Sequence, residues 1–329
     1  MLTLTFTAED ALRTRLAISP LWEVVAGVRA MRDPSRHSLH LPWVVAARAA
    51  VADVDIGLLT DLVTRSARTP DFVTVPPETP VAELADELER LRAVAPAQVR
   101  ADLDASGAWR GRAVRALYDE PEKGLAHLAA AVERFWSAAL APHWPRLRGL
   151  LEADVSYRAR KITSGGARAL FADVHADVRW EAGTVRVTHR PYSHVRSARG
   201  RGLVLVPSVF AWPEVFTVTA EPWQPTLFYP ARGVGTLWER DDGAANALAG
   251  VLGTGRARLL AFLDSPATTT ELAARTGMTT GGVSQHLAAL RAAGLAVGRR
   301  EGRQVFSART ELGDALVAAS GENRAVPGR

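Results

Sequence analysis

The last quarter of the sequence holds the side chains whose types and spacing indicate a chemistry. Val283, Leu287 and Leu290 recur at i, i+4 and i+7, which predicts a helix with one buried stripe. The opposite face carries hydroxyl, amide and guanidinium groups, contributed by Thr280, Ser284, Gln285 and Arg291. Groups of these kinds reach base edges and phosphates in the major groove of DNA, so this face predicts contact with DNA.

An arginine-rich segment follows this helix closely. Beyond Gly294, the runs Leu295–Val297 and Gln304–Ser307 enclose Arg299-Arg300-Glu301-Gly302-Arg303, a pattern that predicts a hairpin with a basic tip. A run of charged residues usually lies on a solvent-exposed face and binds nothing. A solvated hairpin does not require three arginines directly after such a helix, however, so we expect Arg299, Arg300 and Arg303 to contact phosphates.

The positive charge of the sequence is concentrated in the same quarter. The 329 residues carry a formal net charge of +5. From Gly250 onward ten arginines stand against six acidic residues, which leaves only about +1 for the other three quarters. Localised positive charge attracts phosphates, although by itself this signal is weak.

The sequence also predicts the elements that position these side chains. A basic helix is predicted from Arg256 to Leu263, and Thr268 to Glu271 matches the capping box that begins a second helix of about two turns, ending at Gly277. Met278-Thr279-Thr280 makes the tight turn into the third helix. This order of helices followed by a basic hairpin is typical of a winged helix-turn-helix.

The segment from Thr268 to Arg309 resembles the ArsR-type winged helix regulators. The resemblance is carried by Val283-Ser284-Gln285-His286-Leu287, Leu290-Arg291, Ala293-Gly294-Leu295 and Arg300-Glu301-Gly302-Arg303. It implies a homodimer that recognises a partly palindromic operator in double-stranded DNA, usually as a repressor. It also implies which residues face the groove, namely Thr280, Ser284, Gln285 and His286, with Arg299, Arg300 and Arg303 on the wing.

One departure from the family pattern is Gly281-Gly282, where helix formers are more usual. Two flexible residues in the first turn predict that the start of this helix orders fully only on DNA. Metal sensing is disfavoured, because the sequence has no cysteine and the expected last helix, Thr310–Ala319, offers Glu311 and Asp314 without a histidine. We expect no metal site and no cofactor.

The region before this domain predicts an α+β fold. It reads as mainly helical to about Tyr157 and as a small antiparallel sheet after Gly166, where short apolar runs are separated by turn residues. The predicted domains are 1–240, a sensor or dimerisation domain, and 247–320, the winged helix, with a tail at 321–329.

This upstream region resembles the large N-terminal domain of uncharacterised actinobacterial ArsR-type regulators. The motifs are Ile18-Ser19-Pro20-Leu21-Trp22-Glu23, Leu203-Val204-Leu205-Val206-Pro207-Ser208 and the run from Pro225 to Gly233. The resemblance assigns no ligand. Aromatic residues could line a pocket for an apolar or aromatic effector, although a core role is favoured for them: Trp180, Tyr192, Phe210, Trp212, Trp223, Phe228 and Tyr229.

The alternative is an enzyme or a small-molecule-binding protein in which the winged helix serves interaction only. Asp173, His175 and Asp177 could hold a metal or act with His194, but a solvated edge is the more ordinary interpretation. No Gly-x-Ser-x-Gly motif is present, so no catalytic residues are assigned. No apolar run approaches the roughly 20 residues of a membrane span, and the first ten residues predict no secretion signal. We therefore expect a cytoplasmic regulator.

Overall fold

Two compact units make up the chain in the computed structural model, Met1–Gly235 and Thr236–Arg329. The structure describes residues 1–63, 68–107, 111–188, 194–238, 248–263, 266–276, 278–301 and 304–322. Among these residues no helix is long and apolar enough to cross a membrane.

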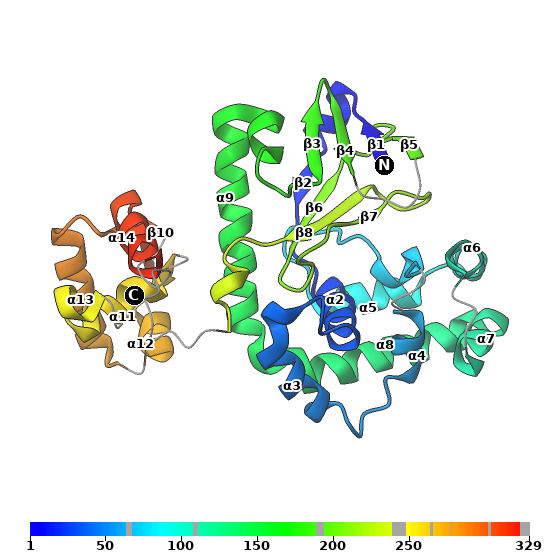
Figure 1. The fold of residues 1–329 in the computed structure, drawn as a ribbon, viewed down its shortest axis with the longest axis horizontal. Coiled ribbons are helices and arrows are strands. Elements are labelled where there is room, and N and C mark those ends of the chain that lie inside the picture. The colour runs from blue at the N-terminus through cyan, green and yellow to red at the C-terminus, as the bar shows by residue number, and fades with distance from the viewer. Residues whose placement is uncertain are drawn as a thin grey trace, which may run out of the picture. The chain divides into compact units, whose positions relative to one another are not determined.

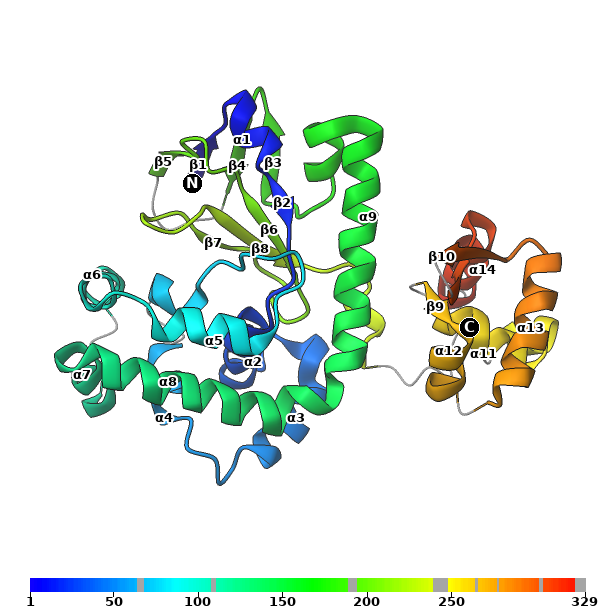
Figure 2. The same ribbon diagram turned by 180° about the vertical axis from the view of Figure 1, so that it is seen from behind.

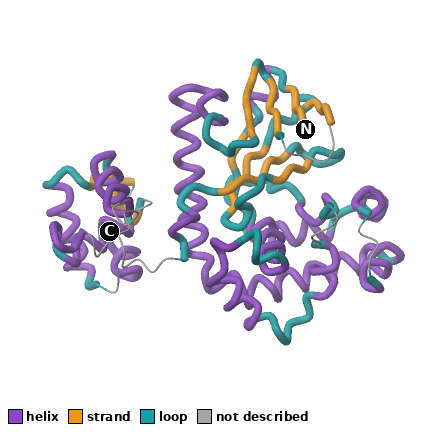
Figure 3. The backbone as a smooth tube through the Cα atoms, in the orientation of Figure 1, coloured by secondary structure: helices purple, strands orange, loops and turns teal. Residues whose placement is uncertain are grey.

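Most helices of the N-terminal unit lie together in one half, and the strands gather in the other half beside the longest helix (Figure 3). The helices are α1 (Ala8–Leu12), α2 (Pro20–Arg32), α3 (Leu41–Ala50), α4 (Gly57–Leu62), α5 (Leu84–Arg92), α6 (Pro96–Ser106), α7 (Arg112–Asp119), α8 (Pro121–Phe135) and α9 (Trp144–Phe171). Helix α8 runs along the base of the helical half, and α9 rises from its end beside the strands (Figures 1 and 2). The backbone of α9 is not helical at Gly165 and Gly166, where the chain turns back.

Helix α2 lies at the centre of this unit. Its N-cap Ser19 accepts a hydrogen bond from the backbone of Trp22, and Pro20 at the first position fits a helix start. The Trp22 ring stacks on Phe228 of the sheet at 3.8 Å between centroids. Ring stacking stabilises a contact beyond the burial of apolar area, so this pair helps to hold α2 against the sheet.

In the described residues of this unit, eight strands form two four-stranded sheets. Their bounds are β1 (Leu2–Thr5), β2 (Arg15–Leu16), β3 (Val178–Glu181), β4 (Thr184–Val187), β5 (His194–Ser197), β6 (Val204–Ser208), β7 (Phe216–Val218) and β8 (Thr226–Pro230). The strand orders are β3-β4-β1-β5 and β2-β6-β8-β7. One core cluster draws on both sheets and on the end of α9, including Leu4, Val185, Leu205, Leu227 and Phe171.

The prediction of an α+β fold is confirmed, but the prediction of one small antiparallel sheet is wrong. Both sheets are mixed, because β1 pairs in parallel with β5, and β6 pairs in parallel with β2 and β8. The partners β1 and β2 come from the first sixteen residues, far from the strands that they join. The sequence held one signal, the unbroken apolar run Leu203–Val206, because strands of parallel sheets are usually buried on both faces, as β6 is.

Pro207 shows how a proline fits the centre of a sheet. The carbonyls of Leu203 and Leu205 accept hydrogen bonds from β2 and the following Ala17, so alternate residues of β6 face that neighbour. Pro207 faces the same way but lies beyond the β2 pairing, which ends at Leu205. Its missing N–H therefore removes no ladder hydrogen bond on that side.

Candidate nucleic-acid interface

The C-terminal unit is built around a small apolar core. Its helices are α11 (Thr254–Phe262), α12 (Thr269–Thr276), α13 (Thr280–Ala292) and α14 (Glu311–Glu322), and its strands are β9 (Ala267–Thr268), β10 (Ala296–Glu301) and β11 (Gln304–Arg309). Val283, Leu287 and Leu290 of α13 are at most 1% exposed, as their spacing predicts. They pack with apolar residues of α11, α12 and the start of β10.

Short-range hydrogen bonds fix the start of both helices of the motif. The predicted capping box is confirmed, because Thr268 N donates to Glu271 Oε2 at 2.8 Å and Glu271 N donates to Thr268 Oγ1 at 3.3 Å. Thr279 caps α13 by accepting from Gly282 N at 3.2 Å. A Cβ at Gly282 would lie 3.2 Å from that hydroxyl, so a side chain there would crowd the cap.

The polar face of α13 points to solvent. Thr280, Ser284 and Gln285 are exposed, while the apolar stripe faces the core. Gln285 has an amide that can both donate to and accept from a base edge, the pairing used for adenine in the major groove. These three side chains are therefore placed where a groove can reach them.

His286 is placed differently from its expected role in the groove. The side chain is half-buried, and its Nε2 lies only 2.7 Å from where a Cβ on Gly255 of α11 would be. The absence of a side chain at Gly255 is what admits the ring. This contact makes His286 a packing residue between two helices, with only part of its surface left for a ligand.

Arg291 also differs from the sequence-based expectation, because its guanidinium is tied to the wing. Its Nη2 donates to Ser307 Oγ at 2.7 Å, and Ser307 is 0% exposed. The guanidinium lies against Gly298, where a Cβ would come within 3.1 Å of it. Gly298 and Ser307 are directly paired in the hairpin, so Arg291 joins the end of α13 to both wing strands.

We expect Arg291→Ala to loosen the wing. Loss of the hydrogen bond leaves the buried Ser307 hydroxyl without its partner, which costs about 1–2 kcal/mol. Native-state hydrogen exchange of β10 and β11 amides would therefore accelerate about tenfold. Ser284→Ala, an exposed change on the same helix, should leave wing exchange unaltered, and equal protection in both variants would contradict the assignment.

Of the three arginines predicted on the wing, two lie in the described residues. Arg299 and Arg300 are exposed on β10, paired with Phe306 and Val305 of β11, whereas Arg303 lies outside the described residues. Successive residues of a strand point to opposite faces. Arg300 therefore shares the face of Gly298, where Arg291 lies, and Arg299 projects from the other face.

The residues weighed for an enzyme or metal site have structural contacts in the N-terminal unit. Asp173 accepts hydrogen bonds from Tyr157 and Arg158. His175 Nδ1 accepts from Asp177 N at 3.1 Å, and its Nε2 lies 3.1 Å from the carbonyl oxygen of Pro213. Among the described residues no group of three or more His, Asp or Glu is arranged to hold a metal ion.

The aromatic residues considered for an effector pocket differ in burial, and Trp212 is 38% exposed. Phe210, Phe228 and Tyr229 are at most 1% exposed. Trp180 stacks on Phe171, and Trp223 donates to Asp102 Oδ2 at 3.3 Å. The core role favoured for these aromatic residues therefore holds for Phe210, Phe228 and Tyr229 and is wrong for Trp212, while Tyr192 lies outside the described residues.

The three-helix order, the exposed polar face of α13 and the arginine-bearing hairpin together define a winged helix-turn-helix DNA-binding domain. A family model described as bacterial regulatory protein, arsR family, matches residues 256–296, and a model for a family of unknown function, DUF5937, matches residues 81–235. No curated protein and no solved structure matches the chain. The chain therefore carries an ArsR-family helix-turn-helix domain behind a DUF5937 domain, which is the arrangement of a DNA-binding transcription regulator with a large N-terminal domain.

Proposed function

We propose that this protein is a homodimeric cytoplasmic repressor that binds an operator with two half-sites and is controlled by a small molecule bound to the N-terminal unit. The chain then acts through binding alone and catalyses no reaction. The observation that carries DNA recognition is the exposed row Thr280, Ser284 and Gln285 above a buried apolar stripe. Control by a small molecule is supported by the size of the first unit, Met1–Gly235, which DNA binding itself does not require.

The experiment is salt-dependent binding of the full chain to a fluorescent library of its own genomic upstream regions, with an unrelated duplex as control. Selective binding to a site with half-sites about 34–36 Å apart, by two chains per site, supports a dimeric regulator. Equal weak binding to every duplex, with no effect of added metabolites, would contradict it. Measuring transcription from the bound promoter then separates repression from activation.

We expect Arg300→Ala to weaken binding to all duplexes and to reduce the slope of log K against log salt by about 0.9 for the lost phosphate contact. Arg299→Ala, an adjacent change on the opposite face of the same strand, should have the smaller effect. Gln285→Ala should leave the salt slope unaltered and relax the sequence preference at one position instead. Fluorescence anisotropy over a salt series measures all three.

An unchanged affinity and slope in both arginine variants would refute the wing assignment. A reduced slope in Gln285→Ala would mean that this side chain contacts phosphate and not a base.

A further inference from the structure

Helix α11 is the basic helix expected from the sequence, and the contacts proposed for α13 and the wing give its charges no role. Its nine residues, Thr254–Phe262, include Arg256 and Arg258 and no acidic residue. Both arginines are exposed. In the part of the chain that the structure describes, neither guanidinium has a hydrogen-bond or ion-pair partner.

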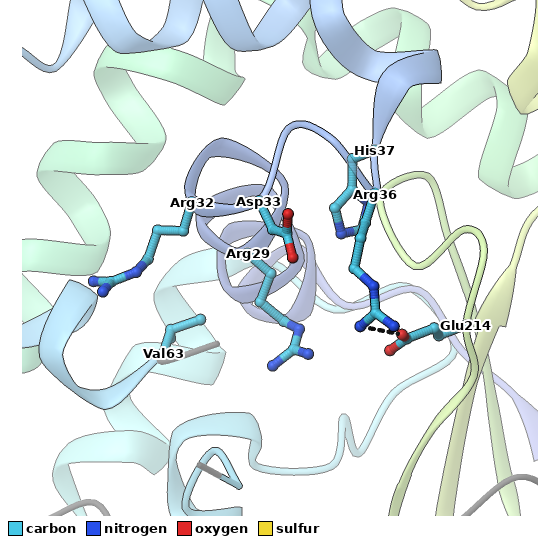
Figure 4. A pocket seen from close by; sticks show the side chains of 7 residues that line it. All are labelled: Arg29, Arg32, Asp33, Arg36, His37, Val63 and Glu214. Atoms are coloured by element: carbon cyan, nitrogen blue, oxygen red, sulfur yellow. Dashed lines mark ion pairs between the residues drawn. The ribbon is translucent and has the colours of Figure 1, made fainter. Parts of the chain in front are cut away.

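Several exposed arginines of the other unit do have a carboxylate partner. Figure 4 shows one such pair beside His37 at the end of α2, where Arg36 Nη1 lies 3.0 Å from Glu214 Oε1. Further exposed pairs are those of Arg13, Arg186 and Arg199. A guanidinium without such a partner keeps its donors available for an anion from another molecule.

Arg258 lies on the outer side of the contact between α11 and α13. Gly255 marks this contact, because a Cβ there would come within 2.7 Å of His286 Nε2. Successive residues of an α-helix are turned by about 100°, so Arg258 projects about 60° from the direction of Gly255. The buried Leu259 and Leu260 are turned the other way, into the core.

Gln285 lies on the same outer side of this contact. It precedes His286 in α13 and therefore projects about 100° from it. The buried Val283 and Leu287 are turned the other way, into the core that α11 shares. Arg258 and Gln285 thus border one surface of the C-terminal unit, on the side away from its core.

The wing borders this surface at the opposite flank of α13. Arg291, whose guanidinium contacts both wing strands, follows His286 by five residues and so projects about 140° from it. The exposed Ser284 and Gln285 lie on the arc between these two directions. Helix α13 therefore has α11 along one flank and the wing along the other.

A helix that reads bases in the major groove has a phosphate backbone on each side. The groove is about 12 Å wide, and an α-helix with its side chains measures about 10–12 Å across, so the helix fills the groove. Elements on the two flanks of the helix then face different backbones. An arginine on either flank can donate two hydrogen bonds to a phosphate.

We propose that Arg258 contacts a phosphate of the backbone that borders the groove on the side away from the wing. Helix α11 and the wing then hold the two backbones, while α13 reads the bases between them. This inference rests on the proposed recognition of DNA by α13 and adds a contact outside the helix-turn-helix and the wing. Arg256 is turned by about 160° from Arg258 around α11 and makes no such contact.

The test is fluorescence anisotropy of the full chain on its preferred duplex over a salt series, with Arg258→Gln and Arg256→Gln as matched variants of one helix. We expect Arg258→Gln to reduce the slope of log K against log salt by about 0.9 per bound chain, which weakens binding about eightfold per chain at 0.1 M salt. Arg256→Gln should keep the wild-type slope. Arg258→Lys, which retains the charge, should keep it as well.

Neutral methylphosphonate groups locate the contact on the duplex. Each phosphate in turn is replaced, and the loss of affinity is measured for the wild type, Arg258→Gln and Arg300→Ala. We expect each variant to lose its sensitivity at one position, and the two positions to lie on opposite sides of the groove. Because the two contacts are separate, the double variant should lose about 1.8 from the slope per chain.

A wild-type slope in Arg258→Gln, or the same loss in Arg256→Gln, would overturn the contact. Sensitivity lost on the same side of the groove in Arg258→Gln and Arg300→Ala would overturn its placement opposite the wing. Failure of the wild-type chain to bind any duplex would refute the proposed function and this inference with it, whereas selective binding with an unaltered slope in Arg258→Gln would refute the inference alone.

Discussion

Arg158→Ala is expected to lower the free energy of unfolding of the N-terminal unit by about 3–5 kcal/mol. The Arg158 side chain is 1% exposed, and its Nε lies 3.6 Å from Oδ2 of Asp154, which is 0% exposed. Arg158 also pairs with Asp173 and donates to the backbone of Leu170 at 3.3 Å. Its removal would leave a buried carboxylate without its cation, although the hydrogen bonds from the Tyr229 hydroxyl and the backbone N–H of Arg232 would remain.

The same helix supplies the control. Arg148 pairs with Glu152 at the same i, i+4 spacing and at 2.8 Å, but these side chains are 38% and 43% exposed. Arg148→Ala should therefore cost no more than about 0.5 kcal/mol, because water screens the pair. Urea unfolding of both variants measures the two losses in free energy of unfolding. Similar losses would mean that burial does not determine how much the Arg158 pair stabilises the protein.

The stability of the N-terminal unit is expected to fall by about 3 kcal/mol between pH 6.5 and 8.5. Two buried carboxyl groups on or against α2 cause this. Burial raises the pKa of Glu23 to about 8, although Ser208 and the backbone N–H groups of Val209 and Phe210 oppose the shift. Burial likewise raises the pKa of Glu87 to about 7, against hydrogen bonds from Ser19 and Leu21.

The direction follows from proton counts. Between its ordinary pKa of 4.5 and its raised pKa, each group is protonated in the folded state and ionised in the unfolded state. The unfolded state then binds fewer protons, so stability declines with rising pH by about 1.4 kcal/mol per pH unit and group, until pH 7 for Glu87 and pH 8 for Glu23. His40 acts in the opposite sense below pH 6.5, because burial lowers its pKa to about 4. The range above pH 6.5 therefore isolates the carboxyl groups.

Glu23→Gln tests this prediction, because glutamine is neutral at every pH and has nearly the same shape. Urea unfolding at pH 6.5 and 8.5 should show a decline for the variant that is less than half that of the wild type. Glu9→Gln, at an exposed position, should follow the wild type. A variant Glu23→Gln with the full decline would show that Glu23 is ionised in the folded protein.

By itself the sequence determined the winged helix. The capping box at Thr268 and the stripe of Val283, Leu287 and Leu290 depend on neighbours three to seven residues apart, so a linear pattern records them. The exposure of Ser284 and Gln285 follows from the same period. Such local features survive in any fold that buries the stripe.

Only the tertiary structure decided which distant groups meet. The parallel pairing of β1 with β5 joins residues nearly two hundred positions apart, and alternating apolar runs do not specify the partner of a strand. The contact of Arg291 with Ser307, the burial of Glu23 and the meeting of His37 with Glu214 likewise depend on packing across the chain. Their chemistry is set by burial and by partners, and neither is a property of a residue's type.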